Sequence, residues 1–381
     1  MSLKLIGTWP EQTFLTRCLI QIVVSANVIS IMIPEIVYVK TTWFDVEVFL
    51  EWVPTFTILF ISFIQLVNLS FHSKNFRSIL DHICSDWERF SDSPNIEILH
   101  KYGARGCWIT KTYLGWMYAA CLCYVVMPLT MPVILESFQP TDSKDPNRTK
   151  ELIYLYNANY GVNSDDYYYI IFGHMFFESW VTIISVLSND VMYFTCVEHA
   201  CALFEIVGEN LKRIRGNETP ADDSKEDINY KIICHCIDLH KEAIIFTSLI
   251  DSSYSACLLV VIGGSLILLS VTGLQVLMYR DELGQLIRFG SYSIAQIFHL
   301  YLNSIPGQKI MDHSLSIFDY AYSVDWHNLT PKAQKLIILM MIRSLRPCQI
   351  TAGKMYIVTM ENYSAVMQTS MSFFTVLSSM Q

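Results

Sequence analysis

Charged residues are scarce in this chain. They make up 16% of its 381 residues, whereas soluble domains usually carry about a quarter. Basic residues number only 26, against 35 acidic ones, and form no cluster, which argues against nucleic acid as a partner. Hydrophobic residues reach 52%, and long apolar runs recur along the whole length. The composition therefore predicts one integral membrane protein rather than a set of soluble domains.

Sequence motifs of the common catalytic sites are also missing. The chain has no G-x-S-x-G, no Walker loop and no H-E-x-x-H, so we expect neither enzyme activity nor a cofactor. Cysteine and histidine do gather in "CHC" at Cys234–Cys236 and in "CVEHAC" at Cys196–Cys201. Because helix residues two apart point to nearly opposite sides, these side chains cannot easily share one tetrahedral ion. We therefore expect core cysteines there, and no metal site.

Seven apolar stretches are long enough to cross about 30 Å of hydrocarbon, which takes roughly 20 residues each. A shorter run at Leu336–Ile342 cannot span, and we expect it to form a buried or re-entrant helix. The predicted fold is all-α, an integral membrane bundle of seven transmembrane helices. The predicted spans are approximately Cys18–Val39, Phe49–Phe71, Tyr113–Phe138, Tyr167–Tyr193, Phe246–Met278, Ile287–Ile305 and Met355–Met380.

The positions of the basic residues predict the orientation. With the N-terminus in the cytoplasm, 20 of the 26 Lys and Arg residues fall in inside segments and six in outside ones. Since cytoplasmic loops are enriched in basic residues, we expect a cytoplasmic N-terminus and an extracellular C-terminus. Two features agree with this. The glycosylation sequon at Asn147 lies in the longest outside loop, and none of the 11 cysteines lies in an outside loop.

That outside loop, Gln139–Asp166, is polar and rich in tyrosine. Both a lid over an outward-facing pocket and a solvated, glycosylated loop are consistent with it. In the fourth span, His174 and Glu178 are four residues apart and share one helix face. Ionisable groups at membrane depth point to a wet cavity or a ligand contact, but a hydrogen-bonded pair that fixes helix packing has the same spacing.

Aromatic residues and methionines gather in the outer halves of four spans. Such side chains suit a small volatile hydrophobic ligand, because dispersion and burial bind it with few polar groups. Ordinary bundle packing and an aromatic belt at the membrane interface are the alternatives. The candidate ligand-binding residues are Trp52, Phe56, Phe60, Tyr124, Met127, Met131, Phe172, Phe176, Tyr292 and Phe298.

The last span mixes apolar residues with Ser, Thr and Gln. At about 100° per residue on a helix, its polar side chains fall within one arc and its apolar ones cluster opposite. A polar stripe of this kind either packs against another helix or meets water. The arc holds Ser364, Gln368, Ser372, Thr375 and Ser379, with Val376 and Met380 at its edge. The opposite side holds Tyr363, Met367, Phe374 and Leu377.

Three short sequence motifs near the end of the chain resemble the signature of the insect odorant receptors. They are "AYSVDW" at Ala321–Trp326, "RSLRPCQITAGK" at Arg343–Lys354 and the closing "YSAVMQTSMSFFTVL". Phe373 stands where the family usually has Tyr, and Tyr363 where it often has Phe. The length, the seven spans and the inside N-terminus also fit.

The resemblance implies a ligand-gated, nonselective cation channel of the plasma membrane. Its ligand would be a small volatile hydrophobic odorant, and its outer surface would contact membrane lipid. It implies assembly with the odorant coreceptor as a heterotetramer in olfactory neuron dendrites. The coreceptor's long insertion between spans four and five is missing, so this chain resembles a ligand-tuning subunit.

The resemblance also divides the chain. Residues 1–305 would form spans one to six, with an odour pocket in the outer halves of spans two, three, four and six. Residues 306–354 would form a cytoplasmic anchor and a short helix, and residues 355–381 the pore-lining helix. The implied gate is Val376 and Met380, and the implied pore positions are Gln368, Ser372, Thr375, Val376, Ser379 and Met380.

Two alternatives stay open at this point. A gustatory receptor has a related channel architecture, but its usual ending, with a Gln-Phe pair, is replaced here by Ser379 and Met380. A G-protein-coupled receptor also has seven spans, but it would place the N-terminus outside, against the count of basic residues. Its Asp/Glu-Arg-Tyr and Asn-Pro-x-x-Tyr words are missing from spans three and seven.

Overall fold

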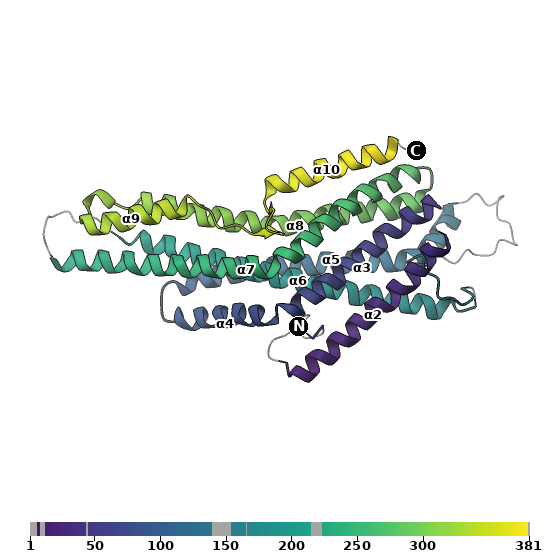
Figure 1. The fold of residues 1–381 in the computed structure, drawn as a ribbon, viewed down its shortest axis with the longest axis horizontal. Helices are drawn as coiled ribbons and strands as arrows, with labels where there is room; N and C mark the ends of the chain where they lie inside the picture. Colours follow the sequence, from purple (N-terminus) through teal and green to yellow (C-terminus); the bar gives the residue numbers. More distant parts are fainter. Residues whose placement is uncertain are drawn as a thin grey trace.

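The structure is a computed structural model that describes residues 6–7, 12–42, 45–138, 154–164, 166–214 and 223–379. Over these ranges the chain forms an elongated bundle of long helices (Figure 1). The helices are α2 (Phe14–Thr41), α3 (Val46–Phe71), α4 (Ser73–Arg89), α5 (Ile96–Phe138), α6 (Tyr168–Leu211), α7 (Asp223–Met278), α8 (Leu283–Tyr322), α9 (Pro331–Ser344) and α10 (Met360–Ser379). A 3-10 turn, η2 (Trp326–Asn328), and two short strands, β1 (Thr351–Ala352) and β2 (Tyr356–Ile357), complete the described elements.

The predicted seven-span, all-α bundle is confirmed. The spans are α2, α3, α5, α6, α7, α8 and α10, and the first five are apolar enough to be recognised by composition alone. The sixth span, α8, carries buried polar side chains such as Gln296, His299 and Asn303. The seventh, α10, carries its polar side chains on an exposed face. These polar residues explain why the last two spans are the least apolar.

Several helices are much longer than the membrane is thick. Helix α7 has 56 residues, which corresponds to about 84 Å at 1.5 Å per residue. A large part of it therefore lies outside about 30 Å of hydrocarbon. In Figure 1 this extension lies beside α9, at the opposite end from the C-terminus. It forms the cytoplasmic end of the bundle.

Two predicted segments differ from the structure. The seventh span was expected to begin at Met355, but Met355–Ile357 belong to the β1–β2 hairpin and the helix begins at Met360. The apolar run Leu336–Ile342 lies within α9, beside the cytoplasmic ends of α7 and α8 (Figure 1), and is not re-entrant. One face of α9 is buried, with Ile337 at 0% exposed, and the other is open, with Leu339 at 61%.

The β1–β2 hairpin fixes the cytoplasmic end of α10 to α7. The Asp251 side chain on α7 accepts hydrogen bonds of 2.7 Å from both the backbone N–H and the hydroxyl of Thr351, and it also pairs with Lys354. The turn needs glycine at position 353, where φ is +61° and a Cβ would come within 2.6 Å of Leu259. The "TAGK" letters of the signature are therefore a tight turn docked on a neighbouring helix.

A cluster of hydrogen-bonded polar side chains is buried in the middle of the bundle. The Asp190 carboxylate on α6 accepts hydrogen bonds from the Tyr113 hydroxyl at 2.5 Å and from His299 Nε2 at 2.9 Å. Asp190 is 1% exposed and His299 is 7% exposed. Because buried polar groups in a span must find partners inside the protein, this cluster fixes α5, α6 and α8 together. It lies beside a cavity among the helices, since His299 also lines that cavity.

Candidate ligand-binding site

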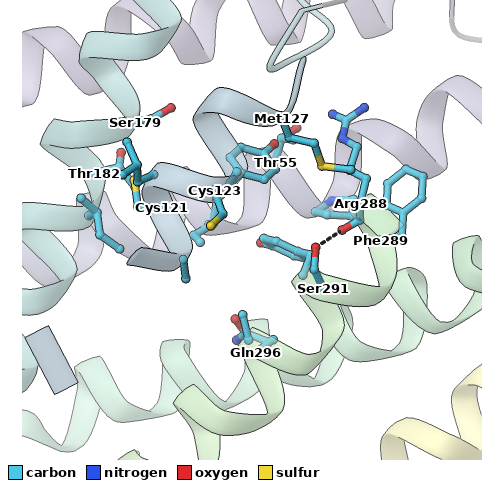
Figure 2. A pocket seen from close by; sticks show the side chains of 18 of the residues that line it. Thr55, Cys121, Cys123, Met127, Ser179, Thr182, Arg288, Phe289, Ser291 and Gln296 are labelled. Atoms are coloured by element: carbon cyan, nitrogen blue, oxygen red, sulfur yellow. Dashed lines mark hydrogen bonds between the residues drawn. The ribbon is translucent and has the colours of Figure 1, made fainter. Parts of the chain in front are cut away.

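A cavity of about 920 Å³ lies among the outer halves of α3, α5, α6 and α8 (Figure 2). Small-molecule sites usually measure about 300–1,000 Å³, so the cavity has room for a small organic ligand. Its wall is mainly aliphatic, with thiol, thioether and aromatic groups and a few hydroxyls. The apolar part of the wall includes Ile58, Ile61, Met117, Ala120, Leu122, Val126, Met127, Ile183, Val186, Leu268, Ile287, Phe289 and Ala295.

The rotation of α3 decides which of its side chains reach the cavity. Glu51, Thr55 and Ile58 lie at spacings of four and three residues and therefore share the face that lines the wall. Trp52 and Phe56 lie on the adjacent face, where their rings stack at 4.6 Å. The aromatic side chains Trp52 and Phe56 therefore do not line the cavity, and smaller side chains such as Thr55 and Ile58 do.

The outside loop covers the cavity at its outer end. Its described part, residues 154–164, contains Leu155 and Tyr156, which are 1% and 6% exposed. The carbonyl of Leu155 accepts hydrogen bonds from the Tyr124 hydroxyl at 3.2 Å and from Arg288 at 3.0 Å. Asn157 donates to Glu51 at 2.6 Å. Of the two interpretations of this loop, the contacts fit the lid.

Tyr156 is the loop residue that enters the cavity wall. Its hydroxyl lies 2.6 Å from the Ser179 hydroxyl on α6. Burial raises the pKa of the Tyr156 phenol, and the neighbouring Glu178 raises it further. The phenol therefore stays protonated and keeps its hydrogen bond to α6, which holds the loop against the cavity.

His174 and Glu178 do not bond each other and do not line the cavity. The ring of His174 is held at 2.9 Å by the Ser30 hydroxyl on α2 and at 2.8 Å by the Tyr160 hydroxyl of the loop. Glu178 is fully buried and accepts a hydrogen bond of 2.5 Å from Thr182, which does line the cavity. The first residue therefore joins the loop to α2 and α6, and the second orients a hydroxyl of the wall.

The cavity wall contains three of the ten residues proposed from the sequence, namely Tyr124, Met127 and Tyr292. Six others lie elsewhere: Phe60, Phe176 and Phe298 are 42%, 39% and 50% exposed on the outside of the bundle. Trp52 and Phe56 stack on each other, and Phe172 stacks on Tyr168 at 5.7 Å. The side chain of Met131 lies outside the described residues, as does the sequon residue Asn147.

Several wall residues were missed by the aromatic criterion. They carry a hydroxyl, thiol or amide group: Thr55, Cys121, Cys123, Ser179, Thr182 and Gln296 (Figure 2). Their sequence signal is a set of polar residues at helical spacing inside an apolar span, as with Ser179 and Thr182. Figure 2 shows that these two lie across the cavity from Ser291 and Gln296.

The seventh span, α10, stands at the side of the bundle and packs mainly on α7 and α8 (Figure 1). Tyr363, Val366 and Met367 pack against the bundle on one side. The predicted pore positions Gln368, Ser372, Thr375, Val376 and Ser379 are exposed on the other, with Val376 at 56%. The second predicted gate residue, Met380, lies outside the described residues.

Comparisons with known proteins agree with this architecture. The family profile described as the seven-transmembrane odorant receptors matches residues 45–371. Odorant receptor 13a of Drosophila melanogaster is 19% identical over 333 residues, which cover 84% of this chain and 77% of that protein. Odorant receptor Or2 of Anopheles gambiae is 22% identical over 332 residues, which cover 84% and 82%.

This chain is also similar to odorant receptor coreceptors and to solved receptor structures. The odorant receptor coreceptor of Aedes aegypti is 24% identical over 168 residues, which cover 43% of this chain and 34% of the coreceptor. The insect olfactory receptor OR5 from Machilis hrabei, solved in complex with eugenol, superimposes with a TM-score of 0.73 and 12% identity, covering 100% of this chain and 96% of that one. Sequence profile and fold thus agree, and the chain belongs to the insect odorant receptor family.

Proposed function

We propose that this chain is the ligand-tuning subunit of an odorant-gated, nonselective cation channel of the plasma membrane, and that it opens together with the odorant coreceptor. The observation that carries the proposal is the lidded cavity of about 920 Å³ among α3, α5, α6 and α8. A mainly apolar wall with a few placed polar groups suits a small volatile molecule, because burial supplies the affinity and the polar groups supply the orientation.

The pore is the open face of α10. Its exposed hydroxyls donate to the helix's own carbonyls, as Ser372 does to Gln368 at 3.0 Å and Thr375 to Met371 at 2.8 Å. A polar face on a span is costly against hydrocarbon, so it belongs against water or another polar surface. Four such helices around an axis would line a channel, and Val376 would form part of an apolar constriction that blocks ions while it is dry.

The subunit contacts lie at the cytoplasmic end. The open face of α9 carries exposed apolar residues outside the membrane, which is the usual mark of a protein interface. Ile338, Leu339 and Ile342 of α9, and Leu345 directly after it, are between 46% and 61% exposed. Residues 306–354 therefore form the anchor through which this subunit meets the coreceptor, and residues from Met360 onwards form the pore-lining helix.

Gating follows from population shift. An odorant that fits the cavity better when α10 is displaced stabilises the open state by its difference in affinity between the two states. The cavity wall includes Leu268 of α7, and α10 packs on α7 through Leu269 and Leu274. A rearrangement at the cavity therefore reaches the pore helix through α7.

The test is recording from cells that express this chain with and without the coreceptor while a panel of volatiles is applied. We expect ligand-evoked cation currents with the coreceptor. Ala120→Trp would place an indole ring in the cavity and strongly reduce them, because Ala120 lines it. Ala119→Trp is the matched control, since Ala119 is exposed and points elsewhere. Full responses in the Ala120→Trp variant would place the ligand outside this cavity and contradict the proposal.

A further inference from the structure

We propose that Tyr292 and Gln296 form a donor–acceptor pair that selects odorants with a hydroxyl group over ethers and esters of the same size. The inference rests on the proposed ligand-binding role of the cavity and specifies its chemistry. Both residues line the cavity from α8, and their spacing of four residues places them side by side on one helix face.

In the described part of the cavity wall, every hydroxyl group except one already donates its proton in a hydrogen bond within the protein. Thr55 donates to the carbonyl of Trp52 at 2.9 Å, and Thr182 donates to Glu178. Ser291 donates to the carbonyl of Arg288 at 3.0 Å, the bond drawn in Figure 2. These oxygens can still accept a hydrogen bond, but they have no proton left for a ligand.

The same holds for the remaining hydroxyls of the wall but one. Thr130 donates to the carbonyl of Val126 at 3.2 Å, and Tyr124 donates to the loop carbonyl of Leu155. Ser179 and Tyr156 lie close together on the opposite side of the cavity. Because Ser179 donates to the carbonyl of Met175 at 2.9 Å, its contact with Tyr156 is donated by the phenol.

The exception is Tyr292. Its hydroxyl is buried and has no hydrogen-bond partner among the described residues. A buried O–H without an acceptor costs free energy that a ligand oxygen can recover. Tyr292 therefore donates to the bound ligand.

Gln296 supplies the matching acceptor, and its orientation is fixed by a neighbour. Ser265 on α7 donates its own proton to the carbonyl of Val261 at 2.7 Å, so its oxygen can only accept from Gln296. The Gln296 amide nitrogen accordingly donates to Ser265 at 2.9 Å. This hydrogen bond fixes the orientation of the amide group, because the flipped amide would place its oxygen against an oxygen that has no proton to donate. The amide carbonyl oxygen is therefore available to accept a hydrogen bond from a ligand in the cavity.

A hydroxyl group fits this pair, and an ether or ester oxygen fits only half of it. The hydroxyl oxygen accepts from Tyr292 while its proton goes to the Gln296 carbonyl. An ether or ester accepts from Tyr292 but leaves Gln296 facing a group that cannot donate. The difference is one hydrogen bond inside a mostly apolar cavity, which corresponds to about tenfold in half-maximal concentration.

The experiment compares isomers of equal size on the chain co-expressed with the coreceptor. Benzyl alcohol and para-cresol are each compared with anisole, and octanol with heptyl methyl ether. We expect the hydroxyl isomer of a pair to be about tenfold more potent. Gln296→Met should bring the ratio close to one by weakening the hydroxyl isomer. Tyr292→Phe should weaken both isomers. Ser316→Ala removes a hydroxyl of α8 that donates to the carbonyl of His313 and lies outside the cavity wall, and should leave the ratio unchanged.

The potency ratio separates this inference from the proposed function. Both isomers are measured on the same variant, so a change in folding or surface expression cancels. Ethers as potent as their hydroxyl isomers on the unmodified chain would overturn the inference alone. A full hydroxyl preference in Gln296→Met would also overturn it. If no volatile evokes a current from the chain expressed with the coreceptor, both the proposed function and this inference are overturned.

Discussion

Arg288 on α8 donates a hydrogen bond of 3.0 Å to the backbone carbonyl of Leu155, and so ties the outer loop to the cavity wall. Arg288→Met keeps the aliphatic stem but removes this bond. We expect the lid to open more often, and the half-maximal odorant concentration to rise roughly fivefold, the factor for loss of about 1 kcal/mol. Deactivation of the current after odorant washout should become faster.

The matched control for Arg288→Met is Arg280→Met. The Arg280 side chain is 75% exposed and pairs with the neighbouring Asp281 at 3.6 Å. It should leave potency and deactivation unchanged. Equal effects of the two substitutions would show that the net charge of the outer surface, rather than the loop contact, controls the response.

Cys123 offers a chemical probe of the cavity, because its thiol is exposed within the cavity wall. A methanethiosulfonate reagent that attaches a bulky group there should reduce odorant-evoked current, and an odorant present during the reaction should slow the loss. Cys123→Ser should remove most of the effect. Cys257→Ser should stay as sensitive as the unmodified chain, since Cys257 is 1% exposed and outside the wall. Unaltered sensitivity in Cys123→Ser would mean that the ligand site lies elsewhere.

Val376 is the described residue of the proposed gate. Val376→Ala removes apolar surface from the constriction, so it should favour a wetted, conducting pore. We expect the odorant-free current to rise about fivefold, as for loss of about 1 kcal/mol of apolar contact, with closing slowed. The ranking of odorants should not change, because the cavity is untouched. Phe373→Leu, on an exposed position outside the polar arc, is the control. Normal currents in Val376→Ala would contradict the gate assignment.

Gly353 tests the hairpin that begins the pore helix. Gly353→Ala places a side chain in a left-handed backbone conformation, which costs about 1–2 kcal/mol, and drives a Cβ into Leu259. We expect reduced thermal stability of the purified protein and less protein at the cell surface. The double substitution with Leu259→Ala should recover part of the loss, because it removes the overlap. Gly115→Ala, a helical position with no neighbour within 4 Å, should be neutral. Wild-type stability in Gly353→Ala would mean that the turn is not structurally required.

The membrane fold could be predicted from sequence because length, hydropathy and basic residues act over whole segments. The boundaries of the helices depend on single residues and were harder to predict. Nothing in the hydropathy of Met355–Ile357 separates a hairpin from the first turn of a span, and the distinction comes from Gly353 and from Asp251, about a hundred residues away in sequence.

The residues that line the cavity were harder to predict. In a membrane, an apolar side chain is stable both against lipid and against a cavity, so periodicity does not separate Phe60 or Phe298 from Tyr292. Exposed aromatics on the lipid side look the same in sequence as aromatics lining a pocket. Polar residues are more informative, because Thr182 and Gln296 need partners that hydrocarbon does not supply.

The hairpin between α9 and α10 also sets the mechanics of the pore helix. Since Asp251 holds the hairpin that precedes α10, a swing of that helix would pivot about its cytoplasmic end. Its 20 residues form a lever of about 30 Å, so a rotation of about 10° displaces its far end by about 5 Å. Val376 lies near that far end, where a small rotation at the hinge produces a large change in width. The proposed gating therefore needs only a modest rearrangement at the cavity to admit ions.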